Sequence, residues 1–311
     1  MDENGILYGL RCLGQEVVTC NLQLLPPLKR VAAWHRAWSE VHPDLIFCYG
    51  YWDTRFTPED LKPPIGFRPV PFVYWASDDP IYMYFSSLPM LTRADLILTT
   101  TEECIPVYQR SGCRAGLLQF GCNPNLHRPA EPTELHQFVL IANNYGRTGT
   151  TSFRLRCNRD ILMPIVERGY DIKIWGLWWT DSQRPCSIPP LLYGGSLPYE
   201  QLAEIYSGAE IVLGMQFHHL SRTQTSCRVF ETLACRAFYL GPYTNGTVTY
   251  FEHGKHLVLS NSAEETLELA SYYLDHPLER ARIAAAGQKE VYNKHTYEHR
   301  AREFLAEVEK L

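Results

Sequence analysis

The sequence predicts an α/β protein made of two Rossmann-like domains, each built on a parallel sheet. Short β-branched or aromatic runs alternate with helical stretches along the chain, and this order produces parallel strands joined by right-handed crossovers. At 311 residues the chain is long for a single hydrophobic core. A Pro-rich stretch of little periodicity, near residues 122–133, separates two series of elements. We therefore expect an N-terminal domain over 1–127 and a C-terminal domain over 128–311, facing across a cleft.

Five strands are expected in the first domain, because five apolar runs are bounded by polar or turn residues. These runs are "EVVTC", "DLIFCYG", "PFVYWAS", "DLILTT" and "GLLQFG". Helical stretches alternate with them near residues 4–13, 26–41, 80–92 and 102–111.

The second domain repeats the alternation. Its expected strands lie in "QFVLIAN", "DIKIWG", "LLYGG", "AEIVLGMQ", "AFYLGP" and "HLVLS". The helices between and after them are expected near residues 152–168, 198–208, 226–235, 263–275 and 278–310. We expect the last and longest of these helical segments to pack back on the N-terminal domain.

Composition argues against several classes of protein. The chain has 45% hydrophobic and 20% charged residues with a formal net charge of −5, so it lacks the basic stripe typical of nucleic-acid-binding proteins. No apolar run is long enough to span a membrane. The opening "MDENG" has no basic region typical of a signal peptide. We therefore expect a cytoplasmic protein without nucleic-acid partners or a membrane span.

The cysteines and histidines do not indicate a metal site. The ten cysteines include no C-x-x-C pair, and several lie in apolar patterns, among them Cys20, Cys48 and Cys235. Buried reduced thiols are the simplest interpretation. His295 and His299 are one helical turn apart, and His218 adjoins His219, but no third ligand stands nearby in the sequence. We expect no metal ion and no other cofactor.

A single carboxylate stands out in the stretch "SCRVFETLAC". Glu231 lies inside the apolar stripe of the predicted helix, and a buried carboxylate is unfavourable without a partner. Ligands of parallel sheets bind beyond the carboxyl ends of the strands, where this helix begins, so Glu231 can accept hydrogen bonds from the vicinal hydroxyls of a ribose. The alternative is an ion pair with Arg228, three residues earlier. The pattern alone leaves both interpretations open.

A family resemblance favours the ribose. "RVFETLAC", "DHPLERARIAAAG" and "KHTYEHRA" resemble the C-terminal part of GT-B glycosyltransferases of the spore maturation protein, or CgeB-like, branch. "GGSLPYEQL" and "YWASDDP" are similar to further segments of that family. The resemblance implies a bacterial, metal-independent hexosyltransferase that uses a nucleoside-diphosphate sugar, with UDP or dTDP as the nucleotide. It also implies an acceptor that is a glycan, a protein or a small molecule, and a role in spore coat or cell-surface glycan formation.

The same resemblance implies a set of nucleotide-binding residues. Glu231 would hold the ribose, and Glu231→Ala is expected to weaken nucleotide binding with little loss of fold. The diphosphate would lie against one helix start and one loop, the base against one strand end, and the base or ribose against a second strand end. The helix start consists of Ser226, Cys227 and Arg228, and the loop contains Asn144, Tyr145 and Arg147. The first strand end is Gly195, Ser196 and Leu197, and the second is Trp175 with Gly176.

The sequence departs from the family at two places. Thr223 stands eight positions before Glu231, where related retaining enzymes often carry a first glutamate. The strand and Gly-containing loop that usually open the N-terminal domain are also missing. A catalytically inactive nucleotide-binding relative is therefore the leading alternative, and a two-domain epimerase or binding protein is a more distant one.

Two neighbouring carboxylates are the candidate catalytic bases. Asp78 and Asp79 follow the predicted strand "PFVYWAS", and an inverting transfer needs a base that takes the acceptor proton. Adjacent carboxylates in different environments can differ in pKa. The alternative is that one of them caps a helix that begins at Pro80.

Overall fold

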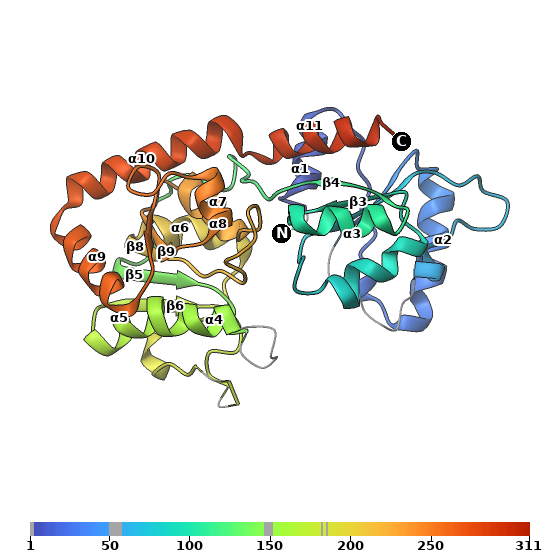
Figure 1. The fold of residues 1–311 in the computed structure, drawn as a ribbon. Coiled ribbons are helices and arrows are strands. Elements are labelled where there is room, and N and C mark those ends of the chain that lie inside the picture. The colour runs from blue at the N-terminus through green and yellow to red at the C-terminus, as the bar shows by residue number, and fades with distance from the viewer. Residues whose placement is uncertain (1–2, 50–57, 146–151, 182, 185) are drawn as a thin grey trace. The chain divides into compact units, whose positions relative to one another are not determined.

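The computed structural model describes residues 3–49, 58–145, 152–181, 183–184 and 186–311. The chain forms two compact units (Figure 1). We call Leu10–Gln119 with Arg300–Leu311 the N-terminal unit, and Met1–Gly9 with Phe120–His299 the C-terminal unit. Each unit contains one parallel sheet, which confirms the predicted α/β class with two Rossmann-like sheets.

The N-terminal sheet has the strand order β1-β2-β3-β4. Every residue of β2 and β3 is buried, as expected for central strands of a parallel sheet covered on both faces. The strands are β1 (Ile46–Tyr49), β2 (Phe72–Ala76), β3 (Leu96–Thr99) and β4 (Arg114–Leu117). The helices are α1 (Ile6–Cys12), which spans the boundary of the two units, α2 (Pro27–Val41) and α3 (Ile105–Arg110).

Two sequence-based predictions for this unit are wrong. The stretch "EVVTC" forms no strand; Val18 is 55% exposed and Cys20 is exposed, so β propensity alone did not pair this segment with a neighbour. The stretch 80–92 is not one α-helix. It is a turn, a π-helical segment (Met83–Ser87) and a 3-10 segment (Leu88–Thr92).

The closing helical segment is divided into α10 (Pro277–Lys294) and α11 (Tyr297–Val308). The break lies where the backbone N–H of Cys122 donates to the carbonyl of His295, and the N–H of Tyr297 donates to the carbonyl of Cys122. Beyond the break, α11 joins the N-terminal unit: the Phe304 ring lies 4.8 Å from the Phe47 ring, centroid to centroid.

The C-terminal sheet has the order β10-β9-β8-β5-β6-β7. Its strands are β5 (His136–Ile141), β6 (Ile172–Trp175), β7 (Tyr193–Gly195), β8 (Ala209–Leu213), β9 (Tyr239–Pro242) and β10 (Val258–Ser260). All pairings are parallel. Because β5 lies between β6 and β8, the chain direction across the sheet reverses there. The carboxyl ends of β5 and β8 are therefore where this fold binds ligands.

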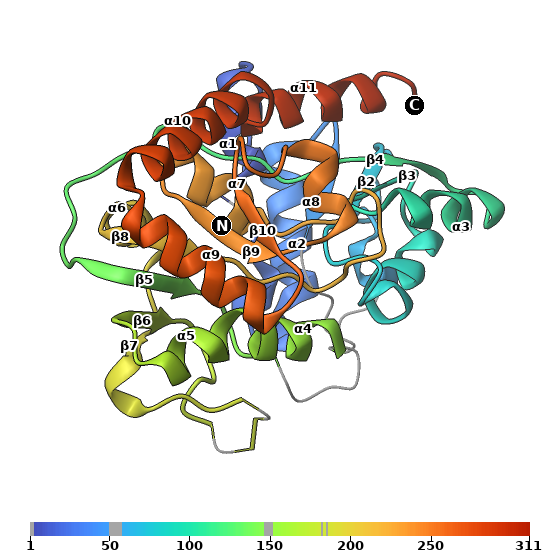
Figure 2. The ribbon, with the colours of Figure 1, turned by 60° about the vertical axis from the view of Figure 1, so that its left-hand side comes forward.

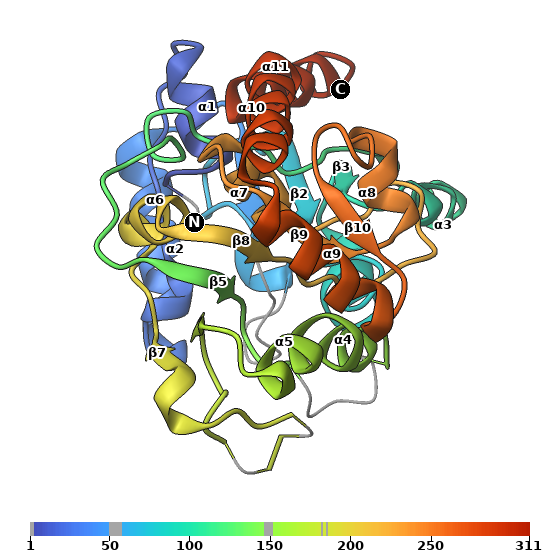
Figure 3. The ribbon, with the colours of Figure 1, turned by 90° about the vertical axis from the view of Figure 1, so that its left-hand side faces the viewer.

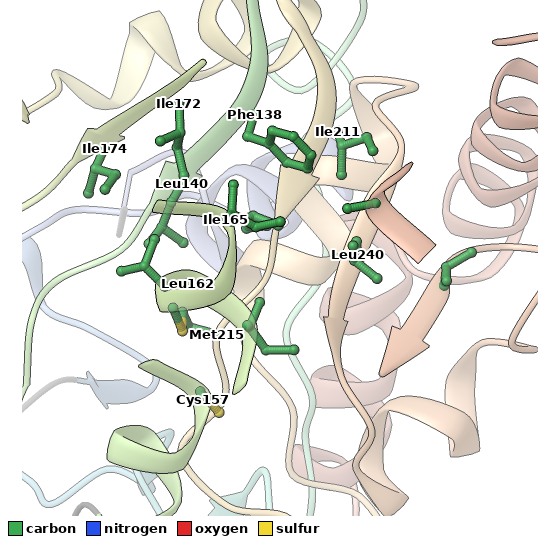
Figure 4. Close-up of a cluster of buried hydrophobic side chains, with 14 of the residues drawn as sticks. Phe138, Leu140, Cys157, Leu162, Ile165, Ile172, Ile174, Ile211, Met215 and Leu240 are labelled. Atoms are coloured by element: carbon green, nitrogen blue, oxygen red, sulfur yellow. The ribbon is translucent and has the colours of Figure 1, made fainter. Parts of the chain in front are cut away.

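Helices cover both faces of this sheet. Alternate residues of β5 enter opposite clusters: Phe138 and Leu140 pack in one (Figure 4), and Val139 and Ile141 pack in the other. The first cluster includes residues of α4 (Ser152–Cys157), α5 (Met163–Arg168) and α9 (Ala263–Asp275), and α5 packs against α9 (Figure 3). The second includes residues of α6 (Leu202–Ser207). In Figure 2, α9 leads into α10, which contacts α7 (Cys227–Ala234).

Candidate functional site

A hydrogen bond joins the two ends of the loop between β8 and α7. Gln216 is fully buried after β8, and its Oε1 accepts a 2.9 Å hydrogen bond from the backbone N–H of Ser226. Ser226 is the N-cap of α7, and its hydroxyl accepts from the backbone N–H of Arg228. The start of α7, with Cys227 in its first turn, is thus held beside the carboxyl end of β8. A helix N-terminus in this position favours an anion.

Glu231 lies one turn into α7 and is 0% exposed. Its Oε2 lies 2.6 Å from Nη1 of Arg228, and its Oε1 accepts a 2.8 Å hydrogen bond from the hydroxyl of Tyr199. Burial alone would raise the pKa of Glu231, but the charge of Arg228 and the hydrogen bonds from Tyr199 and Arg228 lower it below its ordinary value. The carboxylate therefore stays ionised, and the ion pair anticipated as one of its two roles is present.

Tyr199 and His127 complete this cluster and were missed by the sequence analysis. The Tyr199 ring meets the His127 ring edge-on at 5.5 Å between centroids, and the Arg228 guanidinium lies 5.8 Å from the centre of the Tyr199 ring. His127 is 0% exposed, and its Nε2 has no hydrogen-bond partner among the described residues. The contact between Tyr199 and Glu231 spans 32 residues of sequence, so no local pattern could have indicated it.

The loop after β5 carries three predicted phosphate-binding residues. Asn144 is 0% exposed, and its amide donates to the carbonyls of Trp178 and Cys186, so its donors hold neighbouring loops together. Its Oδ1 is buried, and no group in the described ranges donates a hydrogen bond to it. The Tyr145 ring lies against Phe217, which follows β8, at 5.0 Å between centroids. Arg147 lies outside the described residues.

A second arginine, Arg154 on α4, was not expected at this loop. It is 2% exposed, and its Nη2 donates a 2.6 Å hydrogen bond to the carbonyl of Asn143. Its guanidinium lies 5.4 Å from the centre of the Phe217 ring. Within the described part of the chain no carboxylate forms an ion pair with Arg154, and burial lowers its pKa to about 10. The sequence held no signal for this, because Arg154 occurs among several arginines of one helix.

The expected base-binding residues differ in what they contribute. Trp175 is 5% exposed and packs in the hydrophobic cluster on the α6 face, so most of its ring is covered by protein, and its role at the base or ribose stays a prediction. Gly176 and Gly195 join β6 to β7 through a 2.9 Å backbone hydrogen bond. Ser196 is exposed, and the side chain of Leu197 packs against the same cluster as Trp175.

The two candidate catalytic carboxylates have different environments. Asp79 is 1% exposed, and its carboxylate accepts hydrogen bonds from Ser87, Thr99 and Tyr108 at 2.8, 2.8 and 2.5 Å. Burial raises its pKa, and these donors offset part of that effect. Little of this carboxylate is open to an acceptor hydroxyl, so the structure favours Asp78 over Asp79 as the candidate base, and a catalytic role of Asp79 stays a prediction.

Asp78, by contrast, is exposed. The protein surrounding its carboxyl and the neighbouring Asp79 both raise its pKa. Its backbone carbonyl accepts from the N–H groups of Ile81 and Tyr82, so the turn that carries it is ordered. No side-chain capping bond from Asp78 or Asp79 to the following backbone is present among the described residues, contrary to the capping alternative.

Within the described ranges, no three His, Cys, Asp or Glu side chains gather as a metal site would require. None of the described helices combines the length and the apolar character needed to cross a lipid bilayer.

Comparison with known proteins gives a consistent result. Residues 152–306 match the family model described as "Glycosyl transferase-like". The chain is 23% identical to the spore protein CgeB of Bacillus subtilis over 256 residues, 78% of this chain and 76% of that protein. Sucrose-phosphate synthase from Thermosynechococcus elongatus superposes with a TM-score of 0.63 at 14% identity, covering 91% of this chain and 77% of that one.

A second solved structure is Anabaena HepE in complex with UDP and glucose, with a TM-score of 0.60, 12% identity, and coverage of 96% of this chain and 84% of that one. The structural matches support the fold, and the family match covers residues 152–299 of the unit that holds Glu231. Residues 152–306 of this chain therefore resemble the glycosyl transferase-like family, and the chain has the GT-B fold and is similar to spore protein CgeB.

Proposed function

We propose that this protein transfers a hexosyl group from a UDP- or dTDP-sugar to an acceptor hydroxyl. The observation that carries the proposal is Glu231, a carboxylate kept ionised one turn inside the helix that begins beside the carboxyl end of β8. An ionised carboxylate accepts two hydrogen bonds from a vicinal ribose diol. The UDP bound to Anabaena HepE, a protein of the same fold, supports a uridine nucleotide as the first to test.

The donor's diphosphate is proposed to lie between the start of α7 and the loop after β5. Backbone N–H groups near Ser226 and Cys227 offer donors there. Arg228 has a side chain that is 28% exposed, and Arg154 adds a buried positive charge beneath the loop that contains Asn144 and Tyr145. These charges favour a diphosphate, and we propose that transfer needs no metal ion.

Asp78 is the proposed general base for an inverting transfer. It is exposed on an ordered turn, and its raised pKa brings it closer to the range in which a carboxylate removes a proton efficiently. Retaining relatives often have a glutamate at the position of Thr223, which has no carboxylate and is only 4% exposed. A retaining transfer is therefore not the one proposed.

The acceptor is proposed to be a glycan, a protein or a small molecule, and the setting the cytoplasm of a bacterium that builds spore-coat or cell-surface glycans. The 23% identity to spore protein CgeB supports this setting.

The experiment is a two-stage assay. Thermal unfolding is first followed with a panel of nucleoside diphosphates, because a ligand at 100 times its Kd stabilises by about 2.7 kcal/mol. Release of the diphosphate from UDP- and dTDP-sugars is then measured, which requires no knowledge of the acceptor. We expect stabilisation by UDP or dTDP and slow release of that nucleotide from its sugar. Binding without any turnover would favour the inactive nucleotide-binding relative.

A further inference from the structure

The Glu231 carboxylate is closed off in the structure. Glu231 is 0% exposed, and each of its oxygens has a partner: Oε2 pairs with Arg228 and Oε1 accepts from the Tyr199 hydroxyl. A ribose diol cannot reach this carboxylate unless one partner moves. The tyrosine O–H is the same kind of donor as a ribose O–H, and at 2.8 Å it makes the same kind of bond.

We propose that Tyr199 occupies the position of a ribose hydroxyl at Glu231 and that the nucleotide displaces it, so that Tyr199 competes with the ribose and limits the preference for nucleotides with a free 2′,3′-diol. This inference rests on the proposed function, since it requires that Glu231 binds the ribose. It identifies Tyr199 as a specificity-determining residue of the donor site.

Tyr199 is the partner that can leave at the lower cost. The bond between Arg228 and Glu231 is a buried ion pair at 2.6 Å, and removing one member strands a charge in the interior. Tyr199 is neutral, is only partly buried and makes one hydrogen bond through its hydroxyl. It begins the three-residue 3-10 segment Tyr199–Gln201, directly after Pro198. A rotation of its side chain opens Oε1 and leaves the ion pair intact.

His127 gives an independent reason to expect a second position for this ring. Its Nδ1 accepts from the backbone N–H of Asn123, so the hydrogen of the neutral ring is on Nε2. That N–H is buried with no acceptor in the part of the chain that the structure describes, an unfavourable state, and the His127 ring touches the Tyr199 ring. When Tyr199 moves away from Glu231, the Tyr199 hydroxyl or an oxygen of the nucleotide can accept a hydrogen bond from Nε2–H of His127.

The test is calorimetric titration of the full chain and its Tyr199→Phe variant with UDP and with 2′,3′-dideoxy-UDP. Phenylalanine keeps the ring but cannot donate a hydrogen bond to Oε1 of Glu231. We expect Tyr199→Phe to bind UDP about tenfold more tightly, the scale of one hydrogen bond to a charged group, and to bind the dideoxy compound unchanged. The preference for UDP should therefore rise about tenfold. The matched control is Tyr74→Phe: Tyr74 is a buried tyrosine of β2 whose hydroxyl lies 2.7 Å from the hydroxyl of Ser86, so the preference should stay as in the parent.

An unchanged preference in Tyr199→Phe, or an equal loss of affinity for both compounds, overturns the assignment and makes Tyr199 a structural residue. If that variant does not fold, NMR of the parent labelled at its tyrosine rings decides: UDP, but not dideoxy-UDP, should shift the ring resonances of Tyr199, and equal shifts with the two compounds overturn the proposal. If UDP binds and Glu231→Gln weakens it while Tyr199→Phe has no effect, only this inference fails. If the parent binds no nucleotide, the proposed function fails with it.

Discussion

Nη1 of Arg228 lies 2.6 Å from Oε2 of Glu231, and the carboxylate is completely shielded from solvent. The two residues are three positions apart on α7. The same carboxylate therefore stabilises the fold and is the proposed ribose ligand, whereas the sequence presented these roles as alternatives.

The first prediction concerns Glu231→Ala. The expectation of little loss of fold is revised, because this change leaves Arg228 partly buried without its partner; removing one member of a buried pair costs about 3–5 kcal/mol. We expect a loss of that order in the free energy of unfolding, measured with urea. The control is Glu252→Ala, which removes an exposed pair with Lys255 and should leave the unfolding curve unchanged. Equal curves for Glu231→Ala and the parent would contradict the account.

The second prediction concerns pH. The pKa of Glu231 is lower in the folded chain than its ordinary value, so its stabilising contribution is complete above the unfolded pKa of about 4.3 and is lost as the pH falls through the folded pKa. Glu231→Gln lacks this contribution. The free energy of unfolding should therefore fall more steeply in the parent than in Glu231→Gln on acidification below about pH 4.3. Parallel pH profiles would show that the carboxylate is not stabilised in its ionised form.

The third prediction compares two glycines at the ends of β6 and β7. Gly176 has φ +130°, and an added Cβ would lie 2.1 Å from the carbonyl oxygen of Ala142. Gly195 has φ +93°, and nothing lies within 4 Å of its Cβ position. Gly195→Ala should therefore cost only the left-handed backbone strain, about 1–2 kcal/mol. Gly176→Ala should cost clearly more, and thermal unfolding of the two variants measures the difference. The reverse order would contradict the geometry of this loop.

The fourth prediction separates the two aspartates. Asp78→Asn should leave nucleotide affinity unchanged and lower the release of diphosphate from a nucleotide sugar by roughly 10²–10⁴-fold, as expected for loss of a general base. Asp79→Asn should instead lower the melting temperature, because its amide group would face three hydroxyl donors. Turnover at the parent rate in Asp78→Asn would remove Asp78 from the mechanism.

The fifth prediction concerns metal ions. If the charges of Arg228 and Arg154 and the start of α7 hold the diphosphate, excess chelator should not change the rate at which a nucleotide sugar is turned over. A rate that falls with chelator and returns with added Mg²⁺ would contradict the proposed metal independence. Measuring UDP affinity with and without the chelator then shows whether the metal ion acts on nucleotide binding or on the transfer step.

Most of the fold was predictable because the apolar runs have the period of their elements. The run "QFVLIAN" became β5, and Phe138 and Val139 enter opposite cores as the alternation of a strand requires. The helix α8 (Asn245–Tyr250) was missed: its β-branched residues and glycine have low helix propensity. It exists because Thr244 caps the backbone N–H of Thr247, which is fully buried.

The candidate site was predictable only where its contacts are local. Arg228 and Glu231 are one turn apart, so their pairing could be anticipated from the sequence. The bond from Tyr199 and the packing of His127 depend on how distant segments come together, and so does the position of Arg154 beneath the loop after β5. The burial of Trp175 follows from the face of β6 on which it lies, and the run "DIKIWG" alone does not indicate which face is covered by α6.

The central claim is that Glu231 binds the ribose of a nucleotide donor, and calorimetric titration of UDP into the parent and into Glu231→Gln tests it most directly. Glutamine keeps the size of the side chain, and urea unfolding confirms that the variant is folded. The account predicts one bound UDP per parent chain and an affinity at least about tenfold weaker in Glu231→Gln, the scale of one hydrogen bond to a charged group. Equal affinities in the two proteins, or no binding of UDP or dTDP to the parent, would contradict it.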